Sequence, residues 1–176
     1  MANTYIPIAT VTVGSGGAAN IEFTSIPQTY TDLLVKASLR DNRTDSPVTD
    51  TVITFNSSGS GYSIRMLYGD ASFSTPGSAT TSGAVYIAGQ YQNTNQTTSN
   101  TFSNTEIYIP NYTSSNNKSI SVDAVTETNG TPIYASIVAG LWANSSVISS
   151  IKLAPMYGTL AYVQHSSATL YGIKNS

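Results

Sequence analysis

The C-terminal third of the chain constrains the fold most, because it consists of three almost uncharged runs separated by turn residues. The runs cover residues 133–142, 147–153 and 168–173, with Asn, Ser, Gly and Pro between them. Short apolar runs rich in β-branched residues and bounded by turn residues are typical of buried strands in a packed sheet. We therefore expect the domain to close only when its last strand is in place.

The rest of the chain repeats this pattern and contains no stretch with the periodicity of an amphipathic helix. In residues 30–40 apolar and polar side chains alternate, so Leu34, Lys36 and Arg40 are expected on the wet face of a strand. About ten such runs predict an all-β fold with little or no helix. The expected fold is a single antiparallel β-sandwich of jelly-roll type over residues 1–176, with an immunoglobulin-like sandwich as the alternative.

Two β-hairpins are expected from short connections between neighbouring runs. The first joins residues 5–13 to residues 21–24 through a glycine-rich turn, and the second joins residues 51–55 to residues 62–67. Two longer polar segments, residues 69–82 and 90–104, are interpreted as loops. Loops of this length in a compact domain are usually functional or mobile.

The N-terminal run is interpreted in two ways. Proline cannot donate a ladder hydrogen bond, so Pro7 favours an edge position for this run. The alternative is that residues 1–13 form a docking arm, whose contacts would come from Tyr5, Ile6, Pro7 and Ile8.

The composition excludes several classes of partner. Charged residues make up only 9% of the chain and the net charge is −2, so no basic patch for nucleic acid is expected. There is no cysteine for a disulfide or a thiolate metal site. No apolar run is long enough to cross a bilayer, and the first residues do not form a signal peptide. The chain is therefore expected to be made in the cytoplasm of its host and not to bind membrane.

Catalytic residues are not indicated. His165 is the only histidine and lies in an expected turn, and no Gly-x-Ser-x-Gly nucleophile motif is present. A glycosidase would need two opposed carboxylates. We interpret the four candidate carboxylates as solvated strand or turn residues, and we expect neither enzymatic activity nor a cofactor. These four are Glu22, Glu106, Asp123 and Glu127.

The most charged segment, residues 41–47, leaves two interpretations open. Asp41, Asn42 and Asp45 carry oxygens that could ligate calcium. The spacing lacks the glycine and terminal glutamate of a calcium loop. The favoured interpretation is a loop whose side chains bond their own backbone, with a weak calcium site as the alternative.

The twelve tyrosines are the most informative polar residues, because tyrosine combines an apolar ring with a polar hydroxyl. Tyr108, Tyr134 and Tyr171 lie within expected strands and are interpreted as structural. Four tyrosines at loop edges are interpreted as a contact surface for a partner or a glycan. They are Tyr62, Tyr91, Tyr112 and Tyr157.

Three stretches carry a resemblance to a known group of proteins. They are residues 21–33, Phe55-Asn56 followed by residues 61–63, and residues 170–173. Together they resemble small structural proteins of tailed bacteriophage virions, notably those of marine and cyanobacterial phages. The resemblance implies a jelly-roll-like fold without an active site. It also implies a place on the capsid surface of a virion.

Two functions are compatible with this resemblance. The first is a capsid decoration (cement) protein that binds the major capsid protein and stabilises the shell. The second is a host-glycan-binding module of a tail fibre or tailspike, which the polar segments 69–82 and 90–104 would serve. A homotrimer is also expected, because residues 51–55, 84–88 and 133–142 contain no lysine to protect a sheet edge.

Overall fold

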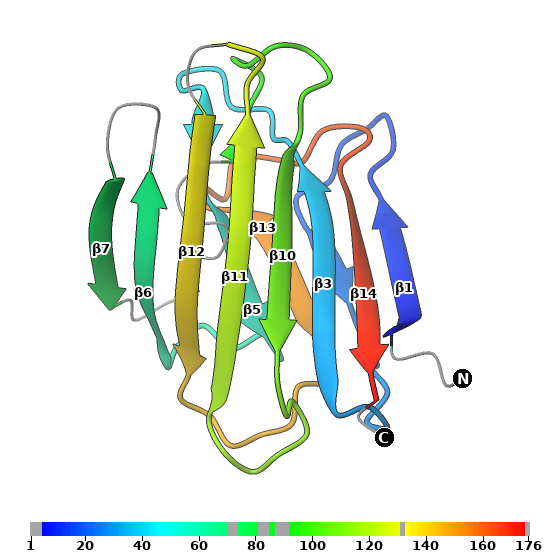
Figure 1. The fold of residues 1–176 in the computed structure, drawn as a ribbon. Helices are drawn as coiled ribbons and strands as arrows, with labels where there is room; N and C mark the ends of the chain where they lie inside the picture. The colour runs from blue at the N-terminus through cyan, green and yellow to red at the C-terminus, as the bar shows by residue number, and fades with distance from the viewer. Residues whose placement is uncertain (1–4, 70–73, 81–84, 87–91, 131–132, 175–176) are drawn as a thin grey trace.

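The chain folds into two packed antiparallel β-sheets (Figure 1). The computed structural model describes residues 5–69, 74–80, 85–86, 92–130 and 133–174. All secondary-structure elements assigned in these residues are strands, which confirms the expected all-β sandwich. The jelly-roll connectivity stays a prediction. Within the described part of the chain, no helix is long and apolar enough to cross a membrane.

The larger sheet has eight strands and all of its strand pairs are antiparallel. In spatial order they are β1 (Tyr5–Thr12), β14 (Ser167–Ile173), β3 (Asp32–Leu39), β10 (Ser103–Ile109), β11 (Lys118–Glu127), β12 (Ile133–Trp142), β6 (Tyr62–Gly69) and β7 (Ser74–Thr80).

The smaller sheet has four strands and lies behind the larger one in Figure 1. In spatial order they are β2 (Ile21–Phe23), β13 (Ile151–Pro155), β5 (Thr51–Phe55) and β8 (Val85–Tyr86). A separate pair is formed by β4 (Val48–Thr49) and β9 (Gln92–Asn93).

The core lies between the two sheets and contains a three-ring cluster. Phe55 comes from the smaller sheet, whereas Tyr62 and Trp142 are neighbours in the larger one. The ring centroids are 5.5 to 6.2 Å apart, within the range of favourable aromatic pairs. The Tyr62 hydroxyl accepts a hydrogen bond from the Phe55 N–H at 2.9 Å and donates one to the Ser58 carbonyl at 3.3 Å. These contacts join the sheets.

Both expected hairpins are wrong. β2 pairs with β13 and not with β1, while β5 pairs with β13 and β6 pairs with β12. Each short connection crosses between the layers, so the apolar side chains of consecutive strands enter the core from opposite sides. The loop expected over residues 69–82 is also wrong in part, because β7 occupies residues 74–80.

The last strand completes the larger sheet, as expected. β14 lies between β1 and β3 and pairs with both along its length. Of the two interpretations of the N-terminal run, residues 5–12 form the edge strand, in which Tyr5, Ile6 and Pro7 pair with Ile173, Gly172 and Tyr171. A register shift follows between Pro7 and Ala9. The expected docking contacts are therefore already part of the sheet.

The alternation predicted Arg40 on the wet face of a strand. This prediction is wrong, because Arg40 is almost fully buried. Its Nη1 donates to the Thr97 hydroxyl (2.9 Å) and to the carbonyls of Thr98 (2.9 Å) and Thr101 (3.0 Å). Its Nη2 donates to the Thr97 carbonyl at 3.0 Å. The described part of the expected polar loop, residues 92–104, therefore folds around a guanidinium instead of forming an open loop. The three residues without exposed surface at its start are Gln92, Asn93 and Thr94.

The edge argument for a homotrimer loses most of its support. β5 and β12 are internal strands of their sheets, and only β8 of the three lysine-free runs lies at an edge. The homotrimer therefore stays a prediction that the strand order does not support.

Candidate binding face

The candidate site is the face of the larger sheet that points away from β5 and β13, which we call the outer face (Figure 1). Strand alternation places every second side chain of each strand on this face. No other layer of the described chain covers it, so its side chains are available to a partner.

An apolar strip runs along β12 on the outer face. All five outward residues of this strand are exposed and apolar, and the register places Leu67 of β6 and Val125 of β11 beside them. Ile137 is 59% exposed, Ile133 52% and Leu67 51%. Single exposed apolar residues are ordinary, whereas a contiguous group indicates an interaction surface. The apolar strip consists of Ile133, Ala135, Ile137, Ala139, Leu141, Leu67 and Val125.

A tyrosine cluster lies near the other edge of the outer face. Tyr171 and Tyr108 flank Leu34 in register on the two neighbouring strands, and Tyr5 lies on the edge strand beyond. Leu34 is only 4% exposed because these side chains cover it, although its position faces outward as expected. A hollow of about 310 Å³ between Tyr5, Tyr171 and Lys36 is open to solvent. We call Tyr5, Tyr108 and Tyr171 the tyrosine cluster.

Sequence reasoning assigned Tyr108 and Tyr171 a structural role and missed their place on this face. The alternation along each strand was the signal that could have placed them. Ile107 and Leu170 point into the core, so the adjacent Tyr108 and Tyr171 must point to the outer face. Tyr108 is 37% exposed, and its hydroxyl donates to Asp32 Oδ2 at 2.8 Å. That hydrogen bond to a carboxylate raises the pKa of Tyr108. The ring is thereby held in place with one side open.

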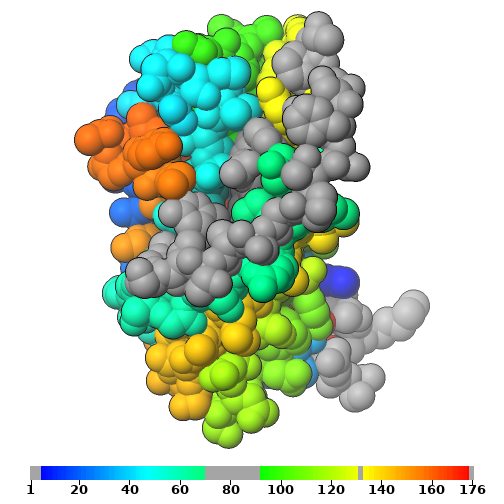
Figure 2. Space-filling view, turned by 90° about the vertical axis from the view of Figure 1, so that its left-hand side faces the viewer, coloured from blue at the N-terminus to red at the C-terminus, as the bar shows by residue number. Residues whose placement is uncertain are grey.

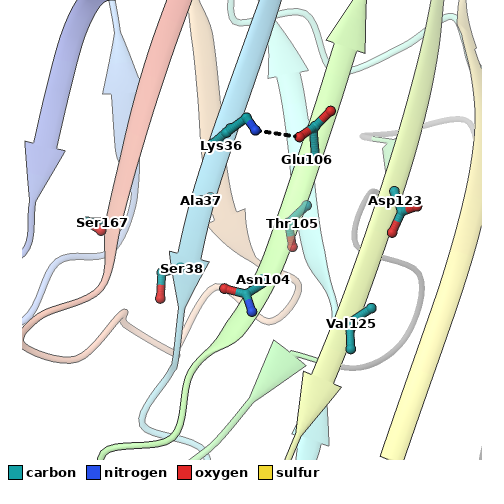
Figure 3. Close-up of a pocket in the computed structure, with 9 residues that line it drawn as sticks. All are labelled: Lys36, Ala37, Ser38, Asn104, Thr105, Glu106, Asp123, Val125 and Ser167. Atoms are coloured by element: carbon teal, nitrogen blue, oxygen red, sulfur yellow. Dashed lines mark ion pairs between the residues drawn. The ribbon is translucent and has the colours of Figure 1, made fainter.

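A shallow hollow of about 480 Å³ separates the strip from the cluster (Figure 3). Lys36 Nζ lies 2.9 Å from Glu106 Oε2, and this contact raises the pKa of Lys36. Both side chains are more than half exposed, so the pair contributes little to stability. Asp123 lies directly opposite Glu106 in the register of β10 and β11. The middle of the outer face is therefore polar and solvated.

The other catalytic candidates do not join these carboxylates. Glu22 lies on β2 in the smaller sheet, and Glu127 ends β11. His165 lies in the expected turn with a φ of 74°, and its N–H donates to the Val13 carbonyl at 3.0 Å.

The expected contact tyrosines have separate outcomes. Tyr62 and Tyr112 are buried, so their prediction as exposed contact residues is wrong; the Tyr112 hydroxyl donates to the Pro27 carbonyl. The rings of Tyr62 and Tyr112 are part of the core, and their hydroxyls bond nearby carbonyls. A position at the edge of a predicted loop does not reveal such burial. Tyr91 lies outside the described residues.

Tyr157 is 46% exposed, and the Arg43 guanidinium lies 5.0 Å from its ring centroid. Figure 2 shows the segment of residues 154–160 (orange) beside the segment of residues 41–50 (cyan). A partner could still reach the tyrosine ring, and its role as a contact residue stays a prediction.

The oxygens of the charged segment are directed at different partners. Asp41 accepts hydrogen bonds from the Arg43 N–H (2.9 Å) and from Gln92 Nε2 (3.1 Å). Asn42 Oδ1 accepts from the Ala161 N–H at 2.9 Å, and Asp45 pairs with Arg43 at 2.6 Å. Asp41 thus bonds the backbone of its own segment as interpreted, whereas Asn42 bonds a distant backbone and Asp45 bonds a side chain. Among the described residues, no group of three His, Cys, Asp or Glu side chains could hold a metal ion.

The chain matches no protein-family model, no curated protein and no solved structure. Function is therefore inferred from the outer face itself.

Proposed function

We propose that this chain is a structural protein of a bacteriophage virion, and specifically a capsid decoration (cement) protein. The apolar strip carries the proposal, because it is an uncovered surface suited to contact with another protein. Covering apolar area contributes about 25 cal/mol per Å². The absence of charge from the strip is typical of the centre of a protein–protein interface, and the polar hollow beside it is typical of a rim.

A decoration role also fits the chemistry of the whole chain. A protein that binds the expanded capsid shell, and not the unexpanded one, stabilises the expanded state by mass action. The expected partner is the major capsid protein, and the expected location is the capsid surface. The resemblance to virion proteins supports this, since residues 21–33 and 170–173 contribute β2, part of β3 and β14, all structural parts of the sandwich.

The test compares particles that carry the wild-type protein with particles stripped of it. We expect stripped particles to release DNA at a lower temperature, and we expect purified protein to restore the original temperature. Hundreds of labelled copies over the head are expected by electron microscopy. An unchanged release temperature, or label confined to the tail, would contradict the proposal.

A second function, host-glycan binding at a tail fibre or tailspike, is favoured by the tyrosine cluster. Its hollow of about 310 Å³ places aromatic rings beside Lys36 and Glu106, and rings next to charged hydrogen-bonding groups can hold a sugar. Glycan-array binding that is lost in Tyr171→Ala but kept in Val147→Ala, an exposed position outside the cluster, would support this function. No binding by the wild-type protein at any array position would remove it.

A further inference from the structure

The geometry points to a second copy of this chain as the occupant of the apolar strip, packed face to face about a twofold axis that runs along β12. The inference rests on the proposed role of the outer face as a protein-binding face, and it assigns the shell contact to the part of that face that a pair of chains leaves uncovered. The strip is centred on β12, so this rotation lays Ile137, Ala139 and Leu141 over the same residues of the second copy, while Leu67 lies over Asp123.

The charges that flank the strip differ in sign. Arg65 of β6 lies beside Ala139 on one flank. Asp123 of β11 lies beside Ile137 on the other flank. Arg65 and Asp123 are both exposed. One flank is therefore positive and the other is negative.

Only one of the two simple face-to-face arrangements brings these opposite charges together. A twofold axis along β12 places β6 of one copy over β11 of the other. Residues at the same height along the strand direction then lie opposite each other. Arg65 then lies opposite Ser121 of the second copy. Asp123 is the next residue along β11 whose side chain points to the same face. That step is about 7 Å, within the reach of an arginine side chain. The symmetry forms the contact twice.

The alternative axis, perpendicular to β12 through Ile137, places β11 over β11. Asp123 would then face Asp123 of the second copy, since it lies level with Ile137. Like charges placed directly opposite destabilise an interface. The flanking charges therefore favour the axis along β12.

The favoured arrangement leaves Tyr5 and Tyr171 of the tyrosine cluster free, whereas Tyr108 on β10 lies under the second copy. When β6 lies over β11, β10 lies over β7, which is the last strand of the sheet. β3, β14 and β1 extend past that edge, so a pair of chains presents an uncovered Tyr5 and Tyr171 at each of its two ends. A pair can thus bind a shell or a glycan at both ends.

The first test is sedimentation equilibrium at micromolar concentrations. We expect the wild-type chain at twice its monomer mass of 18.5 kDa. Ile137→Glu places two carboxylates near the axis and should give the monomer mass with an unchanged circular dichroism spectrum, because residue 137 points outward. Val147→Glu is the matched control, since Val147 is also exposed but lies in the connection after β12, and it should remain paired.

A monomeric or three-chain wild-type mass would overturn the inference, and so would an Ile137→Glu variant that still pairs. The axis is tested by a charge swap: Arg65→Asp and Asp123→Arg should each weaken pairing about tenfold, which is about 1.4 kcal/mol. The double variant should recover most of that loss. A double variant weaker than both single ones would exclude this axis.

The two proposals fail separately. A paired chain that does not stabilise particles would contradict the decoration role and keep the inference. A monomeric chain that does stabilise particles would overturn the inference and keep the decoration role.

Discussion

Replacing Arg40 by methionine tests what holds the polar segment of residues 92–101 in place. Methionine retains most of the aliphatic length and removes the guanidinium. The carbonyls of Thr97, Thr98 and Thr101 then lose their donor, while the fold around them still limits access to water. We expect this segment to detach or to remain with unsatisfied carbonyls, and either outcome destabilises the fold.

The magnitude follows from the contacts. Hydrogen bonds to a charged group contribute about 1.5–3 kcal/mol each, but those within one network are not additive. Burial lowers the pKa of Arg40, which reflects the cost of desolvating the cation and offsets part of that gain. We therefore expect the free energy of unfolding to fall by about 3–5 kcal/mol, the range for breaking a buried charged network. In a domain of this size that lowers Tm by about 6–20 °C.

Urea denaturation followed by tryptophan fluorescence measures the change, because Trp142 is buried in the core. Arg40→Lys should also destabilise the fold, since an ammonium cannot reproduce the planar fork of donors. Lys152→Met is the control, because Lys152 is only partly buried, and it should stay within about 0.5 kcal/mol of wild type. A loss below about 1 kcal/mol in Arg40→Met would refute the reasoning.

Three further changes test the packing and electrostatics. Gly172→Ala should lower the free energy of unfolding by about 1–3 kcal/mol in urea denaturation, because a Cβ there would lie 2.4 Å from the Tyr30 ring; an unchanged midpoint would contradict this. Ending the chain at residue 169 removes most of β14 and should abolish the strand signal in circular dichroism, whereas a folded truncated chain would show that β14 is dispensable. Burial raises the pKa values of Asp41 and Asp50 to about 6, above their ordinary 3.8, so the folded state binds protons more tightly between these values. The free energy of unfolding should therefore fall by about 1–2 kcal/mol per carboxyl as pH rises from 4 to 7, and Asp50→Asn should flatten that slope; an unchanged slope would contradict the assignment.

Local sequence patterns were sufficient where a strand had a regular period. Residues 133–142 were expected as a strand and form β12 with those bounds, and residues 119–125 lie within β11. The partners of strands were not predictable in the same way. β2 and β5 are short runs whose sheet is decided by contacts with β13, about 100 residues or more away along the chain.

The site was harder to predict than the fold, for two physical reasons. Polar composition conceals burial when a chain provides its own hydrogen-bond partners, as Gln92 and Asn93 do. The apolar run of residues 133–142, conversely, was expected to be a buried strand. β12 buries residues of one side, such as Val138 and Trp142, and exposes the other, and only the sheet order reveals that no layer covers it.

Hydroxyl-radical footprinting tests the central claim most directly, namely that another protein covers the apolar strip. The oxidation rates of Ile137, Leu141 and Leu67 are measured by mass spectrometry as protein concentration rises and again on particles. Val147, exposed at 41% and outside the larger sheet, is the internal reference. We expect the three strip residues to become protected while Val147 keeps its rate. Equal oxidation of the strip at every concentration and on particles would contradict the claim.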